Sequence, residues 1–241
     1  MDHFVVSAPA SATSAITFAT TTVAAKDAYG NPAAGWTSVT QCVTFSGPAN
    51  APDGTTPTYP ARLTCLAGQS LLTFNSSGVA AGFNITLIDA ETTALTVTAS
   101  TQTGTSSDIT VSAGTAAGIT FANASNRNGA VNVTCTGPIT SLTCTPSSVN
   151  APGNGRFFSA NIMLVDAHQN PAINTTAGAI VVTLTRGGGS ALTPASLSIP
   201  TAQTTSATTF TLTLNNGSSS ATVTATATVA STAVTVQLTT T

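Results

Sequence analysis

The residues that could do chemistry are few and widely separated in this chain. His168 follows Asp166 by two positions, and one of the many serines could complete a hydrolytic triad with them. A matching stretch near the N-terminus, however, has Tyr29 where the second stretch has His168. The exchange of a general base for a tyrosine favours a role in a turn, so we expect no catalytic residue and no enzyme.

The carboxylates are too dispersed to form a catalytic pair or a metal site. A glycosidase needs two carboxyl groups flanking one bond, and the only close pair, Asp89 and Glu91, has the spacing of a turn. Calcium prefers six or more oxygen ligands, whereas the segment 113–118, AGTAAG, carries no carboxylate. We therefore predict no metal and no cofactor. The carboxylates considered are Asp27, Asp53, Asp89, Glu91, Asp108 and Asp166.

Trp36 and Tyr59 are the two aromatic residues that could contact a sugar. Aromatic residues make up only 5% of the chain, and binding sites are usually lined by aromatic side chains. Trp36 is a possible ligand-contacting residue, but a tryptophan in a β-sandwich is more often part of the packing. The sequence leaves both interpretations open.

A repeated stretch indicates how these residues are positioned. Asp27 to Ala33, DAYGNPA, matches Asp166 to Ala172, DAHQNPA. In each copy a β-type run ends at an Asp, a turn follows, and Asn-Pro stops the strand, because proline cannot continue a ladder. The reuse of the unit predicts two similar domains in tandem, at residues 1–115 and 116–241.

The rest of the chain has the rhythm of short strands separated by Gly, Pro, Asn and Asp. Helical periodicity is nearly absent, so we predict an all-β protein. The second domain carries an insertion, residues 126–155, that reads as a hairpin around Gly137-Pro138. The predicted strands include residues 4–6, 16–26, 39–45, 63–66, 83–87, 95–99, 109–113, 180–185, 210–214, 223–229 and 234–238.

The first domain resembles bacterial immunoglobulin-like domains. The resemblance rests on FVVSAPASATSAITFATTTVAAKDAYGNPAAGW and on the link ITVSAGTAAGITFA. Such domains occur in tandem on surface proteins, adhesins and invasin-like stalks. The resemblance implies two tandem immunoglobulin-like antiparallel Greek-key sandwiches in an extracellular protein. In the second domain it covers only LVDAHQNPA and the C-terminal strands, and the insertion departs from the pattern.

Four cysteines fall two per domain, which suits an oxidising compartment. Cys135 and Cys144 share the parity of the apolar residues in their hairpin, so we expect them to form a disulfide. Cys42 is out of phase with its apolar neighbours, so a bridge to Cys65 would lie on an outer face or need a bulge. Buried free thiols are the alternative for both pairs.

Asparagine-linked sugars could attach at six sequons, a number that chance alone explains in so Thr-rich a chain. Asn84 and Asn132 lie opposite the apolar parity and should face outward. Asn123 shares the parity of Phe121, which makes it the least favourable of the six. The remaining three, in predicted turns, are Asn75, Asn174 and Asn216.

The surface is unusual because only 5% of the residues are charged, against about 25% in an average domain. Five scattered basic residues cannot neutralise a nucleic acid or an anionic membrane, and no apolar run is long enough to span a bilayer. A protein with few charges tends to associate with itself, so other copies of the chain or covalent glycans are the expected partners.

These observations lead to the hypothesis of a non-enzymatic extracellular structural protein, the repeating subunit of a filament. Assembly would use β-strand addition between copies. The alternative is an adhesin stalk, or a carbohydrate- or protein-binding module, from a larger cell-surface protein. The candidate assembly strands contain Phe4, Val5 and Val6 at one end and Val234, Val236 and Leu238 at the other.

Overall fold

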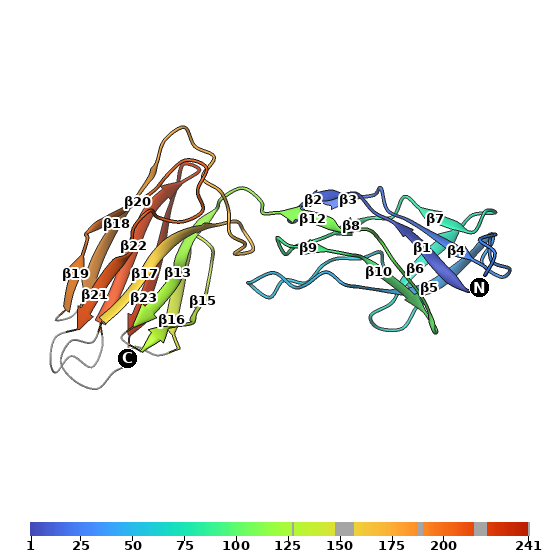
Figure 1. Cartoon of the computed structure of the whole chain (residues 1–241), viewed down its shortest axis with the longest axis horizontal. Helices are drawn as coiled ribbons and strands as arrows, with labels where there is room; N and C mark the ends of the chain where they lie inside the picture. Colours follow the sequence, from blue (N-terminus) through green and yellow to red (C-terminus); the bar gives the residue numbers. More distant parts are fainter. Residues whose placement is uncertain (127, 148–156, 188–189, 215–220, 241) are drawn as a thin grey trace. The chain divides into compact units, whose positions relative to one another are not determined.

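A computed structural model describes residues 1–126, 128–147, 157–187, 190–214 and 221–240 of the protein (Figure 1). The chain divides into two compact units, residues 1–112 and 113–241. Every regular element among the described residues is a β-strand. None of the described segments forms a helix of the length and apolarity that crossing a membrane requires.

Unit 1, residues 1–112, contains four small sheets. One sheet has the order β1-β4-β7 and another β11-β10-β5-β6, while β2-β12-β9 and β3-β8 make up the rest. The bounds are β1 His3–Ser7, β2 Ser11–Thr13, β3 Thr17–Phe18, β4 Thr22–Lys26, β5 Val39–Ser46, β6 Ser70–Phe74, β7 Val79–Ala81, β8 Ile85–Thr86, β9 Thr92–Thr93, β10 Thr96–Ala99, β11 Gln102–Thr105 and β12 Ile109–Ser112.

Alternation of apolar and polar residues sets the core of unit 1. In β4, Val23 and Ala25 are buried, while Ala24 between them and Thr22 and Lys26 at the ends are half-buried. Residues 16–26, predicted as one strand, are divided into β3 and β4. Residues 63–66 were predicted as a strand but form turns, with the amide of Cys65 donating to the carbonyl of Arg62 at 2.7 Å.

Unit 2, residues 113–241, is built from two larger sheets, seen at the left of Figure 1. The five-stranded sheet has the order β14-β13-β17-β21-β19, and the six-stranded sheet β15-β16-β23-β22-β18-β20. The bounds are β13 Gly118–Asn126, β14 Gly129–Ala130, β15 Val133–Thr136, β16 Ser141–Pro146, β17 Phe157–Val165, β18 Ile180–Gly187, β19 Ser190–Thr193, β20 Ser196–Ile199, β21 Phe210–Leu214, β22 Ala221–Val229 and β23 Thr232–Thr240.

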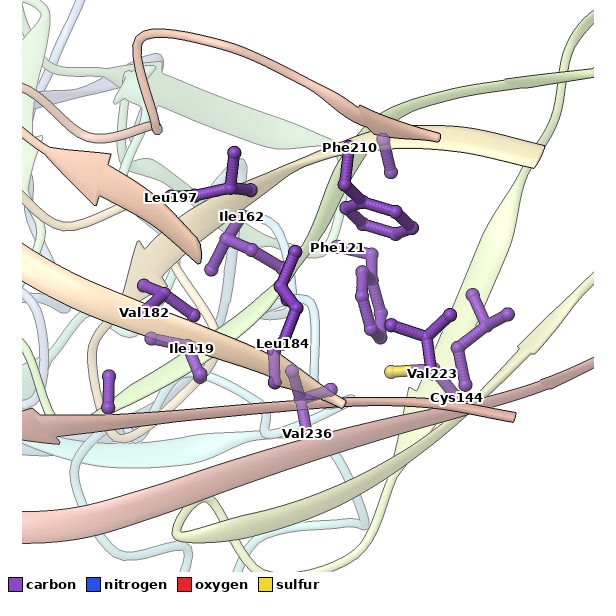
Figure 2. Packing of buried hydrophobic residues seen from close by; sticks show 14 of the residues in the cluster. Ile119, Phe121, Cys144, Ile162, Val182, Leu184, Leu197, Phe210, Val223 and Val236 are labelled. Carbon is purple, nitrogen blue, oxygen red and sulfur yellow. The ribbon is translucent and has the colours of Figure 1, made fainter. Parts of the chain in front are cut away.

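The apolar faces of the two sheets meet in one core (Figure 2). Phe121 and Phe210 from the five-stranded sheet lie edge to face, with ring centroids 5.7 Å apart. Val182, Val223 and Val236 come from three strands of the six-stranded sheet and are fully buried. Because side chains alternate along a strand, the residues next to each of these valines in its own strand point away from the core.

Both units follow one plan. His3 pairs with Lys26 in unit 1, and Gly118 pairs with Val165 in unit 2, each pair directly before the repeated Asp. Between the two strands of each such pair, the chain forms an early strand that pairs in parallel with the last strand of the unit, β2 with β12 and β16 with β23. The insertion is therefore not outside the pattern, because its hairpin supplies the strand β16. Each unit is an immunoglobulin-like Greek-key sandwich, and the protein is all-β.

Candidate functional site

The repeated turn is held by its aspartate in unit 1. Asp27 Oδ1 accepts the backbone N–H groups of Tyr29 at 2.9 Å and Asn31 at 2.8 Å. Asn31 Nδ2 donates to Asp27 Oδ2 at 3.2 Å. These bonds, first the backbone and then the side chain of Asn31, lower the pKa of Asp27. An isolated antiparallel β-bridge between the backbones of Lys26 and Pro32 closes the turn.

The second copy repeats this geometry in a buried setting. Asp166 Oδ1 accepts from the amides of His168 at 2.9 Å and Asn170 at 3.0 Å. Asp166 Oδ2 accepts from Asn170 Nδ2 at 2.9 Å and from the amide of Gly114 at 2.8 Å. Asp166 is 2% exposed and Asn170 is fully buried.

This arrangement explains why the aspartate and asparagine are repeated and the residue between them is not. Four donors occupy the Asp166 carboxylate, among them the backbone N–H of His168, so this carboxylate stabilises the turn. Tyr29, at the equivalent position, is 91% exposed. The contact with Gly114 ties the segment AGTAAG to unit 2, which begins at Ala113.

Two further carboxylates, those of Glu91 and Asp53, also hold loops. Glu91 Oε1 accepts the amide of Ala49 at 2.7 Å, and Asp53 Oδ1 accepts the amide of Thr55 at 2.8 Å. Within the described ranges, no three His, Cys, Asp or Glu side chains are grouped to hold a metal ion. A depression of about 630 Å³ at the ends of β5 and β6 is lined by the uncharged residues Ser38, Val39, Thr40, Gln41, Thr73 and Phe74.

Both aromatic candidates take part in packing. The Trp36 ring lies edge-on to Phe4 at 5.2 Å and to Phe74 at 5.0 Å between ring centroids. Tyr59 stacks on Phe45 at 5.2 Å with an interplanar angle of 9°. Burial, and secondarily the charge of Glu91, raises the pKa of Tyr59 to about 12. Trp36 is partly exposed and takes part in the packing of unit 1, as the packing interpretation of the sequence predicts.

Both cysteine pairs form disulfides. Cys135 and Cys144 stand directly opposite each other in the hairpin of β15 and β16, with Cα atoms 4.0 Å apart. Cys42 and Cys65 have Cα atoms 5.7 Å apart. Cys42 alternates with the buried Val43, so this second bridge lies on an outer face of β5 and fixes the loop before β6 to it.

The structure separates the sequons by accessibility. Asn75, Asn84 and Asn132 are exposed. Asn123 is also exposed, against its parity with Phe121, because β13 has a bulge between Ala122 and Ser125 and Asn123 adopts φ 49° there. The bulge shifts the inward position to Ala124. Asn216 lies outside the described residues.

Asn174 is a wrong candidate, because its side chain is 1% exposed. Its Nδ2 donates to the carbonyls of Gly178 at 3.1 Å and Ile199 at 3.0 Å. Its Oδ1 accepts from the amide of Thr176 at 3.0 Å and from the Thr176 hydroxyl at 2.7 Å. A turn residue was predicted, but the amide is fully used inside the fold, where a glycan cannot be attached.

The two candidate assembly strands are both engaged within their own units. In β1, Phe4 and Val6 are buried and Val5 is 49% exposed. β1 pairs with β4 at five positions. β23, which holds the fully buried Val234, Val236 and Leu238, lies between β16 and β22 and pairs with both.

Gly104 is a residue that the sequence analysis missed. β11 runs beside β1, and a Cβ at Gly104 would collide with the backbone carbonyl of Phe4. The available signal was a glycine inside a strand, which often marks a close approach of another backbone. Gly104 therefore makes room for the N-terminal strand.

No protein-family profile and no curated protein sequence matches the chain. Among solved structures, the adhesin InvE of Yersinia pseudotuberculosis aligns at 15% identity and a TM-score of 0.32, over 98% of this chain and 58% of that protein. Trypsin-activated alpha-2-macroglobulin from Escherichia coli aligns at 12% identity and 0.43, over 98% and 17%. Domains 4–9 of the surface layer protein SbsC align at 16% and 0.30, over 98% and 31%. The chain thus spans less than two thirds of each of these structures, and likenesses this weak carry no functional argument.

Proposed function

We propose that the chain is a non-enzymatic structural module of an extracellular surface assembly, and that it is the repeating subunit of a filament. Neighbouring copies are joined by β-strand addition, in which β1 of one copy replaces β1 in the next. Each of the two sandwiches contains one internal disulfide, which suits an oxidising extracellular setting. The carboxylates of Asp27 and Asp166 hold turns.

The observation that carries the proposal is the setting of β1. Within its own sheet it is an edge strand, and β4 is the strand with which it pairs. Its buried residues, Phe4 and Val6, alternate with the half-exposed Val5. The same segment from a second copy can make identical contacts, as in domain swapping, and a head-to-tail exchange propagates as a filament.

The C-terminal strand is the weaker of the two donors. β23 pairs with β22 at nine positions and with β16 at four. Its removal would divide the six-stranded sheet in two, whereas removal of β1 leaves the β4–β7 pair intact. The geometry therefore favours exchange of β1. We call the space that β1 fills between β4 and β11 the receiving groove, and Gly104 leaves room in it for the backbone of Phe4.

The low charge of the chain supports the same proposal. Five basic and seven acidic residues in 241 give a net charge of −2. Copies of such a protein repel each other weakly, so close association is not opposed by long-range charge.

Competition by a synthetic peptide tests the proposal on the full chain. The peptide comprises residues 1–12, and the matched control peptide replaces Phe4 and Val6 with serine. We expect an excess of the native peptide to block fibre formation in negative-stain micrographs, because it fills the groove beside β4. The control peptide lacks the two buried side chains and should leave the fibres intact.

Deletion of residues 1–12 provides the second arm, with fibres expected to disappear. Fibres that persist both in this variant and in excess peptide would show that β1 is not the donor. Isolated particles of the native chain at every accessible concentration would instead indicate an adhesin stalk or a binding module of a larger surface protein.

A further inference from the structure

The outer face of the six-stranded sheet in unit 2 is a regular array of hydroxyl groups. Figure 2 shows Cys144, Val182, Leu184, Leu197, Val223 and Val236 of this sheet pointing into the core. The residues that alternate with them face outward. The strand registers place these outward residues in rows that cross the sheet.

The first row crosses five strands, from β16 to β20, with each residue paired to the next. Its members are Ser141, Thr235, Thr226, Thr183 and Ser196.

The second row runs from β15 to β18 in the same way. Its members are Thr136, Thr143, Gln237, Thr224 and Thr185. These ten residues, nine with a hydroxyl group and Gln237 with an amide, define what we call the hydroxyl face. By ordinary strand geometry its rows are about 7 Å apart and its strands about 4.8 Å apart.

The hydroxyl face has no charged side chain. Threonine favours strands, so exposed threonines alone are ordinary. A soluble surface, however, normally has about 25–35% charged residues. The six strands contain one charged residue, Arg186, and it pairs with Val223, which has the inward parity.

The polar groups of the hydroxyl face are available to an outside partner. Among the described residues, no side-chain hydrogen bond involves any of the ten members of the face. Elsewhere neighbouring hydroxyls do bond each other, as Thr96 and Thr105 do at 3.0 Å and Ser159 and Thr211 at 2.8 Å.

We propose that the hydroxyl face is a homotypic contact surface, covered by the same face of a second copy of the chain. A hydroxyl both donates and accepts, so a hydroxyl array is complementary to itself. An isologous contact requires such self-complementarity. The face lacks the cationic groups that an anionic polymer would require and the aromatic rings that usually line small-molecule sites.

The size of the face is sufficient for such a contact. The outward face of the sheet continues beyond these two rows, since Thr134 pairs with Thr145 and Thr222 pairs with Thr239. Six strands span about 24 Å, and three outward positions along a strand, this third row included, add about 20 Å. Two faces would then bury roughly 1,000 Å² in total, the lower limit for a specific interface. Twisted sheets stack readily with their strands nearly aligned.

This inference deepens the proposed filament, because face-to-face contact would join filaments side by side while strand exchange extends them. The two contacts use different residues and are separable. Thr226, an exposed residue at the centre of the first row, is the position at which to break the face.

The test compares Thr226→Lys and Thr226→Glu in the full chain with Thr110→Lys, an exposed strand threonine of unit 1. Dimerisation of full-length chains whose end-to-end growth is blocked with the peptide 1–12 is measured by analytical ultracentrifugation, and bundling of unblocked fibres by microscopy. We expect either charge at residue 226 to weaken dimerisation by about a hundredfold or more, because like charges then face each other. An equal mixture of the two variants should restore it, and single fibres should persist in both.

Dimerisation of Thr226→Lys equal to that of Thr110→Lys would overturn the inference, as would failure of the Lys and Glu variants to restore each other. Native chains carrying O-linked sugars on the hydroxyl face, detected by peptide mass spectrometry, would also overturn it. Fibres that persist in excess peptide and after deletion of residues 1–12, while a charge at residue 226 still weakens dimerisation, would contradict strand exchange alone.

Discussion

Replacement of Phe4 by alanine tests the docking of the N-terminal strand directly. Phe4 is 3% exposed and lies edge to face with Trp36, with ring centroids 5.2 Å apart and planes at 79°. Truncation removes a buried aromatic ring from the core of unit 1 and leaves a cavity between β1 and the ring of Trp36. The neighbouring residue Val5, 49% exposed on the same strand, is the matched control.

The expected loss in the free energy of unfolding is large. Truncation of a buried phenylalanine to alanine typically costs about 3 to 5 kcal/mol, a large part of the roughly 5 to 15 kcal/mol that stabilises a domain. Val5→Ala should change stability by no more than about 0.5 kcal/mol.

The chain supplies its own probe, since Trp36 is its only tryptophan and belongs to unit 1. Its fluorescence during denaturant unfolding therefore reports unit 1 without a contribution from unit 2. If Phe4→Ala unfolds at the same denaturant concentration as Val5→Ala, then Phe4 is not buried against Trp36 in solution. In that case the receiving groove we describe for strand exchange would lack its main contact.

Three further predictions concern the rest of the fold. The disulfides span 23 and 9 residues, so loss of Cys42–Cys65 should lower the free energy of unfolding by about 3.4 kcal/mol and loss of Cys135–Cys144 by about 2.6 kcal/mol. Calorimetry of the serine variants should show each loss in its own unit, and equal losses would contradict the loop-entropy argument. Asp166→Ala leaves buried donors unpaired and should destabilise unit 2 by about 3 kcal/mol, more than Asp27→Ala destabilises unit 1, and a reversed order in denaturant unfolding would refute the role of burial. The pKa of Tyr59, raised from 10.0 to about 12, makes unit 1 lose stability as the pH rises through that interval, because the tyrosinate is favoured in the unfolded chain. Tyr59→Phe should abolish this alkaline loss, whereas the lowered pKa of Asp27 predicts a separate loss below about pH 4 that Tyr59→Phe leaves unchanged.

Local patterns predicted the elements whose determinants are close in sequence. The Asp-Asn-Pro turn was readable because its hydrogen bonds join residues two and four apart. The hairpin around Gly137-Pro138 was predicted because its strands are adjacent and its cysteines share one parity.

The failures have long-range causes. Asn174 looked like a turn residue, but its amide bonds Ile199, which is distant in the sequence. Asn123 was assigned by alternation, and the bulge in β13 broke that alternation. The hydroxyl face was invisible as a unit, because its rows exist only once the register of six strands is known.

The parallel pairing of an early and a late strand has a mechanical consequence. In unit 1, β2 pairs with β12 at three positions, and in unit 2, β16 pairs with β23 at four. When a chain is pulled from its two ends, the start of one parallel strand and the end of the other move apart along the strand axis. The hydrogen bonds between them are then loaded in shear and must rupture together. In unit 2 the Cys135–Cys144 bridge also locks the hairpin that leads into β16, so that about 30 Å of chain cannot be drawn out under tension.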